Sequence, residues 1–153
     1  MTPTDVALNL YGQDLDLWYQ ETATTLQKRD FRHLDVDHLI EEILSLSNRN
    51  RREVLSRLDV LLSHLLKRLY VPSTPDYRGW ENTIREQQKQ LRRIFQDSPS
   101  LKGYARQIFD QAWSDAIVDV KANYPDVELP QAWTLTETID ELISPELCLK
   151  LSP

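Results

Sequence analysis

The sequence predicts an all-α fold: an antiparallel bundle of about four to five main helices plus a short C-terminal helix. Apolar residues recur at spacings of three and four along most of the chain, which is the period of a helix surface. No segment alternates apolar and polar residues between hairpin dipeptides such as Asn-Gly. The 153 residues include only three glycines, and most of the eight prolines lie outside the periodic segments. Long helices joined by short links favour a bundle.

The first helix is expected over residues 14–29, because Asp14 and Asp16 suit a helix start. Its inner side would carry Leu15, Trp18, Tyr19, Thr22 and Leu26. Asp35 is the expected N-cap of the second helix. The apolar stripe of that helix would face the bundle through Val36, Leu39, Ile40, Ile43 and Leu44.

The stretch SNRNRRE, residues 47–53, is the ambiguous joint of the chain. Continuing the stripe would place Asn50 or Arg51 in the apolar seam, so a helix break is one alternative. A continuous or gently kinked helix is favoured, because the stretch contains neither proline nor glycine. The strongest apolar segment follows and ends at Val71-Pro72. It consists of Val54, Leu55, Leu58, Leu61, Leu62, Leu65, Leu66 and Leu69.

Three further helices are expected after the loop PSTPDYRG. One runs over about residues 80–95, and the next starts with Ser98 as N-cap and Pro99 at the first helical position. This helix ends near Tyr124-Pro125. A final helix of about ten residues would be capped by Thr134 or Thr136.

Composition indicates one domain over residues 1–153, with a core over about 10–143 and peripheral termini. Cys148 is the only cysteine, which favours a reducing compartment. No apolar run approaches the roughly 20 residues of a membrane span, and the start lacks the pattern of a signal peptide. We therefore expect a cytoplasmic protein that does not associate with membranes.

Charge is unevenly distributed along the chain. Residues 1–48 hold three basic and nine acidic residues, a net charge of −6. Residues 49–93 hold eleven basic and five acidic residues, a net charge of +6, and residues 94–153 hold four basic and ten acidic residues, again −6. Basic central helices packed beside acidic neighbours would explain this pattern. The weaker alternative is nucleic-acid binding through the basic third, which the overall charge of −6 opposes.

Familiar catalytic and metal-binding signatures are absent. Three glycines cannot form a phosphate-cradling loop, and three histidines with one cysteine leave no CxxC or HExxH motif. The sequence therefore predicts no catalytic residue, no metal site and no cofactor.

One polar stripe is the remaining candidate site. Glu53, Arg57, His64 and Arg68 lie on one side of the leucine-rich helix. In the simpler interpretation, Glu53 pairs with Arg57, and His64 bonds a carbonyl or carboxylate on the next helix. In the functional interpretation, His64 is a general base or ligand opposite Glu42 from a facing helix. The candidate pocket then comprises Glu42, Arg57, His64, Arg85 and Glu86.

Five segments of the chain resemble domain of unknown function family 29, a cyanobacteria-rich family. They are LYGQDLDLWYQETATTLQKRDFRHLD, VDHLIEEI, RLDVLLSHLLKRLY, WENTIREQQKQLRRIFQDSPSL and PQAWTLTETIDEL, within about residues 10–143. The resemblance implies a compact helical protein and assigns no activity, substrate or cofactor.

Two functional hypotheses from different classes follow. The leading one is a protein–protein interaction module without catalytic activity, and its partner could be a second copy of the chain in a homodimer. Its candidate anchors are Trp18 and Trp80, with Trp113 and Trp133 as further aromatic contacts. The alternative is a ligand- or metal-assisted enzyme that uses the candidate pocket.

Overall fold

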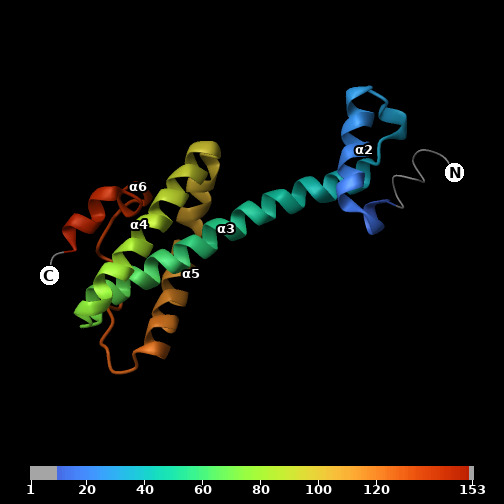
Figure 1. Ribbon diagram of the computed structural model, residues 1–153. Coiled ribbons are helices and arrows are strands. Elements are labelled where there is room, and N and C mark those ends of the chain that lie inside the picture. The colour runs from blue at the N-terminus through green and yellow to red at the C-terminus, as the bar shows by residue number, and fades with distance from the viewer. Residues whose placement is uncertain (1–9, 152–153) are drawn as a thin grey trace. The chain divides into compact units, whose positions relative to one another are not determined.

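The computed structural model describes residues 10–151, and these contain helices and no strand (Figure 1). The all-α prediction is therefore confirmed. The elements in chain order are α2 (Leu15–Gln27), η1 (Phe31–His33), α3 (Val36–Tyr70), α4 (Thr74–Asp97), α5 (Ser100–Asn123), α6 (Ile139–Leu142) and η2 (Pro145–Lys150). Residues 10–13 are also helical.

Contacts along the chain group into two compact units, residues 1–49 and residues 50–153. α3 contributes residues to both units and is a single uninterrupted helix (Figure 1). The single domain expected over residues 1–153 stays a prediction. For residues 47–53, the continuous helix is confirmed. Residues 43–53 are all exposed, so the polar side chains of this stretch face solvent and no packing forces a break.

The N-terminal unit (residues 1–49) is organised around the buried Trp18 of α2, which is 1% exposed. α2 is capped at its start by Asp14, whose carboxylate accepts the Leu17 N–H at 3.0 Å. The helix ends at Gln27, and Arg29, two residues later, has a left-handed backbone conformation with φ of 56°. The N–H groups of Arg29 and Asp30 return to carbonyls of the last helical turn, the arrangement that closes many helices.

The core of the C-terminal unit (residues 50–153) is built on the leucine-rich half of α3. Six residues of the predicted stripe are buried and 0% exposed: Val54, Leu58, Leu61, Leu62, Leu65 and Leu66. The prediction is wrong for Leu69, which is 37% exposed, and Leu55 is only partly buried. α4 adds Trp80, Ile84, Leu91 and Phe95, and α5 adds Leu101 and Val120. α5 also presents Ala105, Ala112 and Ala116, whose small side chains allow close packing of the helices.

Two predicted helix starts are wrong. α4 begins at Thr74 instead of about Trp80, because Pro75 is accommodated in the first helical turn. α5 begins at Ser100 with Pro99 as its N-cap, whereas Ser98 was expected to cap it.

The last predicted helix is also wrong in length. α6 has four residues and is capped by Thr138, whose hydroxyl accepts the Glu141 N–H. Thr136, an expected cap, instead accepts the indole N–H of Trp133 at 2.9 Å. Pro145 starts η2 soon afterwards, so a ten-residue helix is not formed.

Donor side chains of α3 and α4 hold the C-terminal segment, residues 139–151. Arg68 donates to the Leu151 carbonyl at 2.6 Å. The Gln88 amide donates to the carbonyls of Leu142 and Ser144, at 2.9 and 3.0 Å. The Arg92 guanidinium donates to the Ile143 carbonyl. The bonds from Gln88 and Arg92 satisfy carbonyls at the end of α6 and just after it, and the bond from Arg68 satisfies the carbonyl that follows η2.

Candidate functional site

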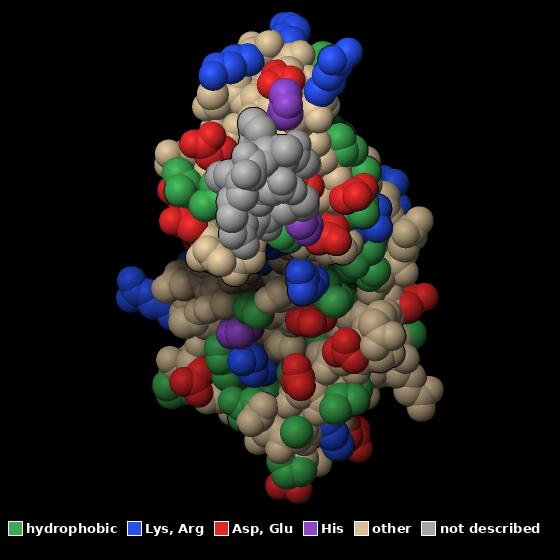
Figure 2. Space-filling view, turned by 90° about the vertical axis from the view of Figure 1, so that its right-hand side faces the viewer, with side chains coloured by type: hydrophobic (Ala, Val, Ile, Leu, Met, Phe, Trp, Pro, Cys, Tyr) green, Lys and Arg blue, Asp and Glu red, His purple; other side chains and the backbone are tan. Residues whose placement is uncertain are grey.

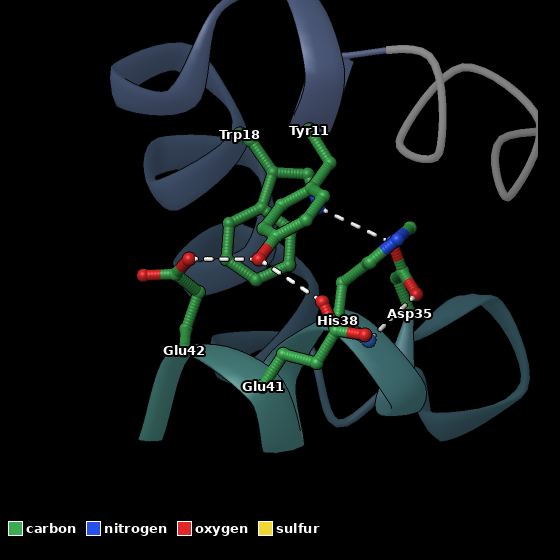
Figure 3. Close-up of polar contacts among 6 residues, drawn as sticks. All are labelled: Tyr11, Trp18, Asp35, His38, Glu41 and Glu42. Atoms are coloured by element: carbon green, nitrogen blue, oxygen red, sulfur yellow. Dashed lines mark hydrogen bonds and ion pairs between the residues drawn. The ribbon is translucent and has the colours of Figure 1, made fainter. Parts of the chain in front are cut away.

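The N-terminal unit contains a polar cluster in which aromatic side chains surround carboxylates (Figure 3). We call it the aromatic–carboxylate cluster. It consists of Tyr11, Trp18, Tyr19, Asp35, His38, Glu41 and Glu42.

Asp35 organises one half of this cluster. Asp35 is 6% exposed and precedes the first residue of α3, where its carboxylate accepts the backbone N–H of His38 at 3.4 Å. Oδ2 of Asp35 lies 2.7 Å from Nδ1 of His38 and accepts the Trp18 indole N–H at 3.3 Å. The imidazole also stacks on the ring of Tyr11, with centroids 3.9 Å apart. Asp35 therefore fixes the orientation of the His38 ring and the start of α3.

Glu42 organises the other half. Its two carboxylate oxygens accept the phenol O–H groups of Tyr11, at 2.8 Å, and of Tyr19, at 2.5 Å. The hydrogen bonds from Tyr19 and Tyr11 lower the pKa of Glu42, and the charge of Arg49 lowers it further. The bond to Glu42 in turn raises the pKa of Tyr11 to about 12 and also raises the pKa of Tyr19. At neutral pH both phenols are therefore protonated donors to an ionised carboxylate.

The cluster joins residues from three helical stretches of the N-terminal unit. Tyr11 precedes α2, Trp18 and Tyr19 belong to α2, and Asp35 and Glu42 lie at and within the start of α3. An aspartate-oriented imidazole could serve as a general base. Among residues 10–151, however, no serine, threonine or cysteine is hydrogen-bonded to His38. We interpret the aromatic–carboxylate cluster as a structural contact that holds α2 against α3, and we also call it the clasp.

Beside the clasp, α3 carries aliphatic side chains that the unit does not cover. Val36, Ile40, Ile43 and Leu44 are 49%, 50%, 57% and 58% exposed. We call these four residues the apolar face of α3. The prediction that this stripe faces the bundle core is wrong for these residues. On the surface displayed in Figure 2, hydrophobic and acidic side chains lie next to one another.

The residues of the candidate pocket have separate partners in the structure. Arg57 pairs with Glu53 at 2.9 Å, as predicted, and also contacts Gln87. Arg85 donates to Asn82, and Glu86 accepts from Gln90 at 2.8 Å. Among the described residues, no hydrogen bond or ion pair joins two members of the predicted set.

Glu42 and His64 lie on the same helix, α3, so the expectation that Glu42 faces His64 from another helix is wrong. Glu42 is bound by the two phenols of the clasp. Nδ1 of His64 lies 2.7 Å from the Val60 carbonyl of its own helix, and Nε2 lies 3.4 Å from Nζ of Lys67. The simple carbonyl bond foreseen for His64 is present, although within α3 instead of across to the next helix.

His64 borders a hollow of about 250 Å³ between α3 and α5. Its lining comprises Asp59, Val60, Ser63, His64, Lys67, Asp119, Val120 and Asn123. Burial lowers the pKa of His64 and of Lys67, which favours their neutral forms.

Asp59 is the residue of this hollow that the sequence analysis missed. Its Oδ1 atom is buried and has no hydrogen-bond donor. Burial, followed by the charges of Asp115 and Asp119, raises its pKa to about 6. The available signal was an acidic residue within the apolar run LDVLL.

We expect Asp59→Asn to stabilise the protein above pH 6. A raised pKa in the folded state means that ionisation of Asp59 opposes folding, so stability falls as the pH rises toward and through about 6. Because solvent screens the partly exposed side chain, we expect a gain of about 1 kcal/mol, or a Tm higher by about 2–4 °C at pH 7.5. The difference in Tm between Asp59→Asn and the wild type should vanish near pH 4, where Asp59 of the folded wild type is protonated and as neutral as asparagine.

Thermal denaturation followed by circular dichroism across this pH range measures the effect of Asp59→Asn. The matched control is Asp110→Asn, at an exposed position of α5, which should change the Tm little at any pH. An equal Tm gain at pH 4 and pH 7.5 would contradict the assigned cause.

The predicted tryptophan anchors are buried. Trp18 is 1% and Trp80 9% exposed, and the indole of Trp80 contacts the rings of Tyr77 and Tyr124. Trp113 and Trp133 pack on each other, with centroids 5.3 Å apart. These side chains consolidate their own units, so a partner would contact other side chains.

The described residues hold no group of three or more histidine, cysteine, aspartate or glutamate side chains arranged to bind a metal ion. None of the described helices is long and apolar enough to cross a bilayer. These observations and the fold define an all-helical protein with a clasped N-terminal unit. The chain belongs to the family described as domain of unknown function DUF29, whose model matches residues 10–147. Comparison with curated proteins and with solved structures gives no match.

Proposed function

We propose that this chain is a protein-binding module without chemistry of its own, and that it contacts its partner through the apolar face of α3. The carrying observation is that Val36, Ile40, Ile43 and Leu44 are each about half exposed on consecutive turns of one helix. Single exposed aliphatic residues are ordinary, but a contiguous group marks an interaction surface. A cytoplasmic setting is inferred from the lone Cys148.

The spacing of the face supports this function. Residues 36, 40, 43 and 44 recur as i, i+4, i+7 and i+8, which places them on one side of a helix. A helix that presents such a row to an apolar surface is a common mode of protein recognition. Covering these side chains would remove aliphatic area from water, which is favourable by about 25 cal/mol per Å².

The clasp supports the same function by fixing the helix in advance. Asp35 holds the first turn of α3, and Glu42 is bound from two directions by Tyr11 and Tyr19. A surface that is already ordered loses less conformational entropy when it binds. The aromatic–carboxylate cluster therefore supports the apolar face without contacting a partner itself.

Site-specific photo-crosslinking tests the proposal. A benzophenone amino acid at position 43 should form crosslinks to protein when illuminated in cells that express the chain. The matched control is position 118 on α5. Val118 is 66% exposed, but the residues three and four positions away on its helix are Ser114, Asp115, Lys121 and Ala122, which form no aliphatic row. Equal, background-level crosslinking from positions 43 and 118 would contradict the proposal.

A further inference from the structure

The apolar face of α3 is bordered by two different flanks. At 100° per residue, the side next to Leu44 carries Asp37 and Glu41, which lie one helical turn apart. The opposite side carries Leu39 and Leu46, of which Leu46 is 51% exposed. A partner that covers the apolar face therefore meets carboxylates along one side and aliphatic side chains along the other.

The carboxylates of Asp37 and Glu41 are accessible to a partner, since both residues are exposed. Asp37 forms no side-chain hydrogen bond or ion pair with another of the described residues. Oε2 of Glu41 lies 3.4 Å from the Tyr11 hydroxyl, but this hydroxyl makes its shorter bond, of 2.8 Å, to Glu42. Unlike Glu42, which is held in the clasp, Asp37 and Glu41 can therefore accept donors from outside the chain.

No cation of the same segment offsets these charges. Residues 36–48 contain three acidic residues and no lysine or arginine, and residues 1–48 have a net charge of −6. His38, the one histidine of residues 36–48, lies 2.7 Å from Asp35 within the clasp. A partner that brings negative charge to this flank is repelled, whereas one that brings lysine or arginine is attracted.

The charge of this flank argues against three other occupants of the apolar face. A second copy that joined the two apolar faces would bring its own residues 36–48, which hold no lysine or arginine, beside the carboxylates. Anionic lipid headgroups attract basic segments, and nucleic acids bind through phosphate contacts with basic side chains. Both would be repelled by Asp37 and Glu41.

We propose that the occupant of the apolar face is a basic amphipathic helix of another protein. Its aliphatic row packs on the face, and lysine or arginine side chains on one of its flanks lie beside Asp37 and Glu41. Side chains spaced three and four residues apart form ridges that pack into the grooves of another helix. Residues 36–44 span about 12 Å at 1.5 Å per residue, so two to three turns of the partner cover them. This inference rests on the proposed protein-binding function and adds the class of partner.

Fluorescence anisotropy of labelled synthetic helices, titrated with the full chain, tests the charge of the partner. Three peptides share one row of leucines and carry lysine, glutamine or glutamate on the flank. We expect the lysine peptide to bind about tenfold more tightly than the glutamine peptide, and the glutamate peptide to bind most weakly. Because the ion pairs are exposed, the advantage of lysine should shrink as salt is added. Equal affinities for the three peptides, or no binding of any, would overturn the inference.

Substitutions of the acidic flank test where the preference arises. Asp37→Lys/Glu41→Lys should reverse the order of the three peptides, and the milder Asp37→Asn/Glu41→Gln should remove the preference. The matched control Asp110→Lys/Glu128→Lys changes the net charge as much as the first variant does, at exposed positions of the C-terminal unit. It should keep the wild-type order. A control that loses the preference equally would show that overall charge attracts the peptide, which overturns the proposed contact.

A neutral substitution tests the apolar part of the contact. Ile43→Asn should weaken binding of the lysine peptide about tenfold, because a polar group without a partner is costly among aliphatic side chains. Val118→Asn, at an exposed aliphatic residue of α5, should leave the affinity unchanged. Binding to phosphatidylserine vesicles that Ile43→Asn abolishes would overturn the inference in favour of a membrane surface.

Mass spectrometry of the photo-crosslinks from position 43 separates the failure of this inference from the failure of the proposed function. Crosslinks to a lysine- or arginine-rich helical segment of another protein support both. Crosslinks to an acidic or uncharged segment, or to a second copy of the chain, overturn the basic partner and leave the binding function standing. Background-level crosslinking, together with no binding of any peptide, contradicts both.

Discussion

Arg68→Ala is expected to lower the free energy of unfolding by about 3 kcal/mol and to release the C-terminal segment. Arg68 is 7% exposed, its Nε atom lies 2.7 Å from Glu81, and its guanidinium donates to the Leu151 carbonyl and covers the ring of Tyr77. Truncation leaves a partly buried Glu81 carboxylate and a buried carbonyl without their donor. Leaving such groups unpaired costs more than the pair contributes when intact.

Urea denaturation measures the loss of stability, and amide hydrogen exchange of residues 139–151 measures the release. Arg93→Ala, an exposed arginine on α4, is the matched control and should change stability by less than about 0.5 kcal/mol. Arg68→Lys should be intermediate, because one ammonium cannot reproduce the planar donor geometry. If Arg68→Ala and Arg93→Ala behave alike, Arg68 does not hold the segment.

Trp18→Ala is expected to unfold the N-terminal unit locally, with a cost of about 3–5 kcal/mol for the residues around it. The side chain is almost completely buried, its rings contact Tyr11 and Tyr19, and its N–H is bonded to Asp35. Its loss removes the largest apolar group of the unit and one donor to the clasp. Without it, the start of α3 loses its support.

Amide hydrogen exchange followed by mass spectrometry is the suitable measurement for Trp18→Ala, because four tryptophans make fluorescence ambiguous. Protection should fall over residues 15–42. Leu17→Ala, at a 39% exposed position of the same helix, is the control and should cause a small change. Trp18→Phe should retain most of the packing and lose the bond to Asp35. If the amides of residues 15–42 exchange as slowly in Trp18→Ala as in the wild type, the N-terminal unit does not depend on the Trp18 indole and the prediction is wrong.

The helices were predictable because their signals are local. Five leucines of residues 58–66 follow the helical period and are buried, and Pro72 follows the end of their helix as expected. The continuity of α3 followed from the absence of proline and glycine in residues 47–53. Where proline and capping residues compete within a few positions, as at Ser98 and Pro99, the predicted helix start differs from the observed one by one residue.

The site was less predictable because it depends on which elements meet. Ile40 and Ile43 follow the same period as the buried leucines, and periodicity alone does not tell whether a partner covers a stripe. Glu42 was singled out from the sequence, but its bonds to Tyr11 and Tyr19 join residues 31 and 23 positions apart. Such pairings depend on how the chain turns at Arg29, which no sequence pattern indicated.

Because Arg29 has a left-handed conformation, the turn after α2 could be made more stable by a substitution at this position. A residue with a side chain is strained at a φ of 56°, whereas glycine adopts this conformation freely. The chain therefore tolerates a local penalty of about 1 kcal/mol at the corner where α2 turns toward α3. Arg29→Gly would recover part of that penalty without touching the clasp or the apolar face. Arg29→Gly should therefore raise the stability of the N-terminal unit while leaving the apolar face of α3 unchanged.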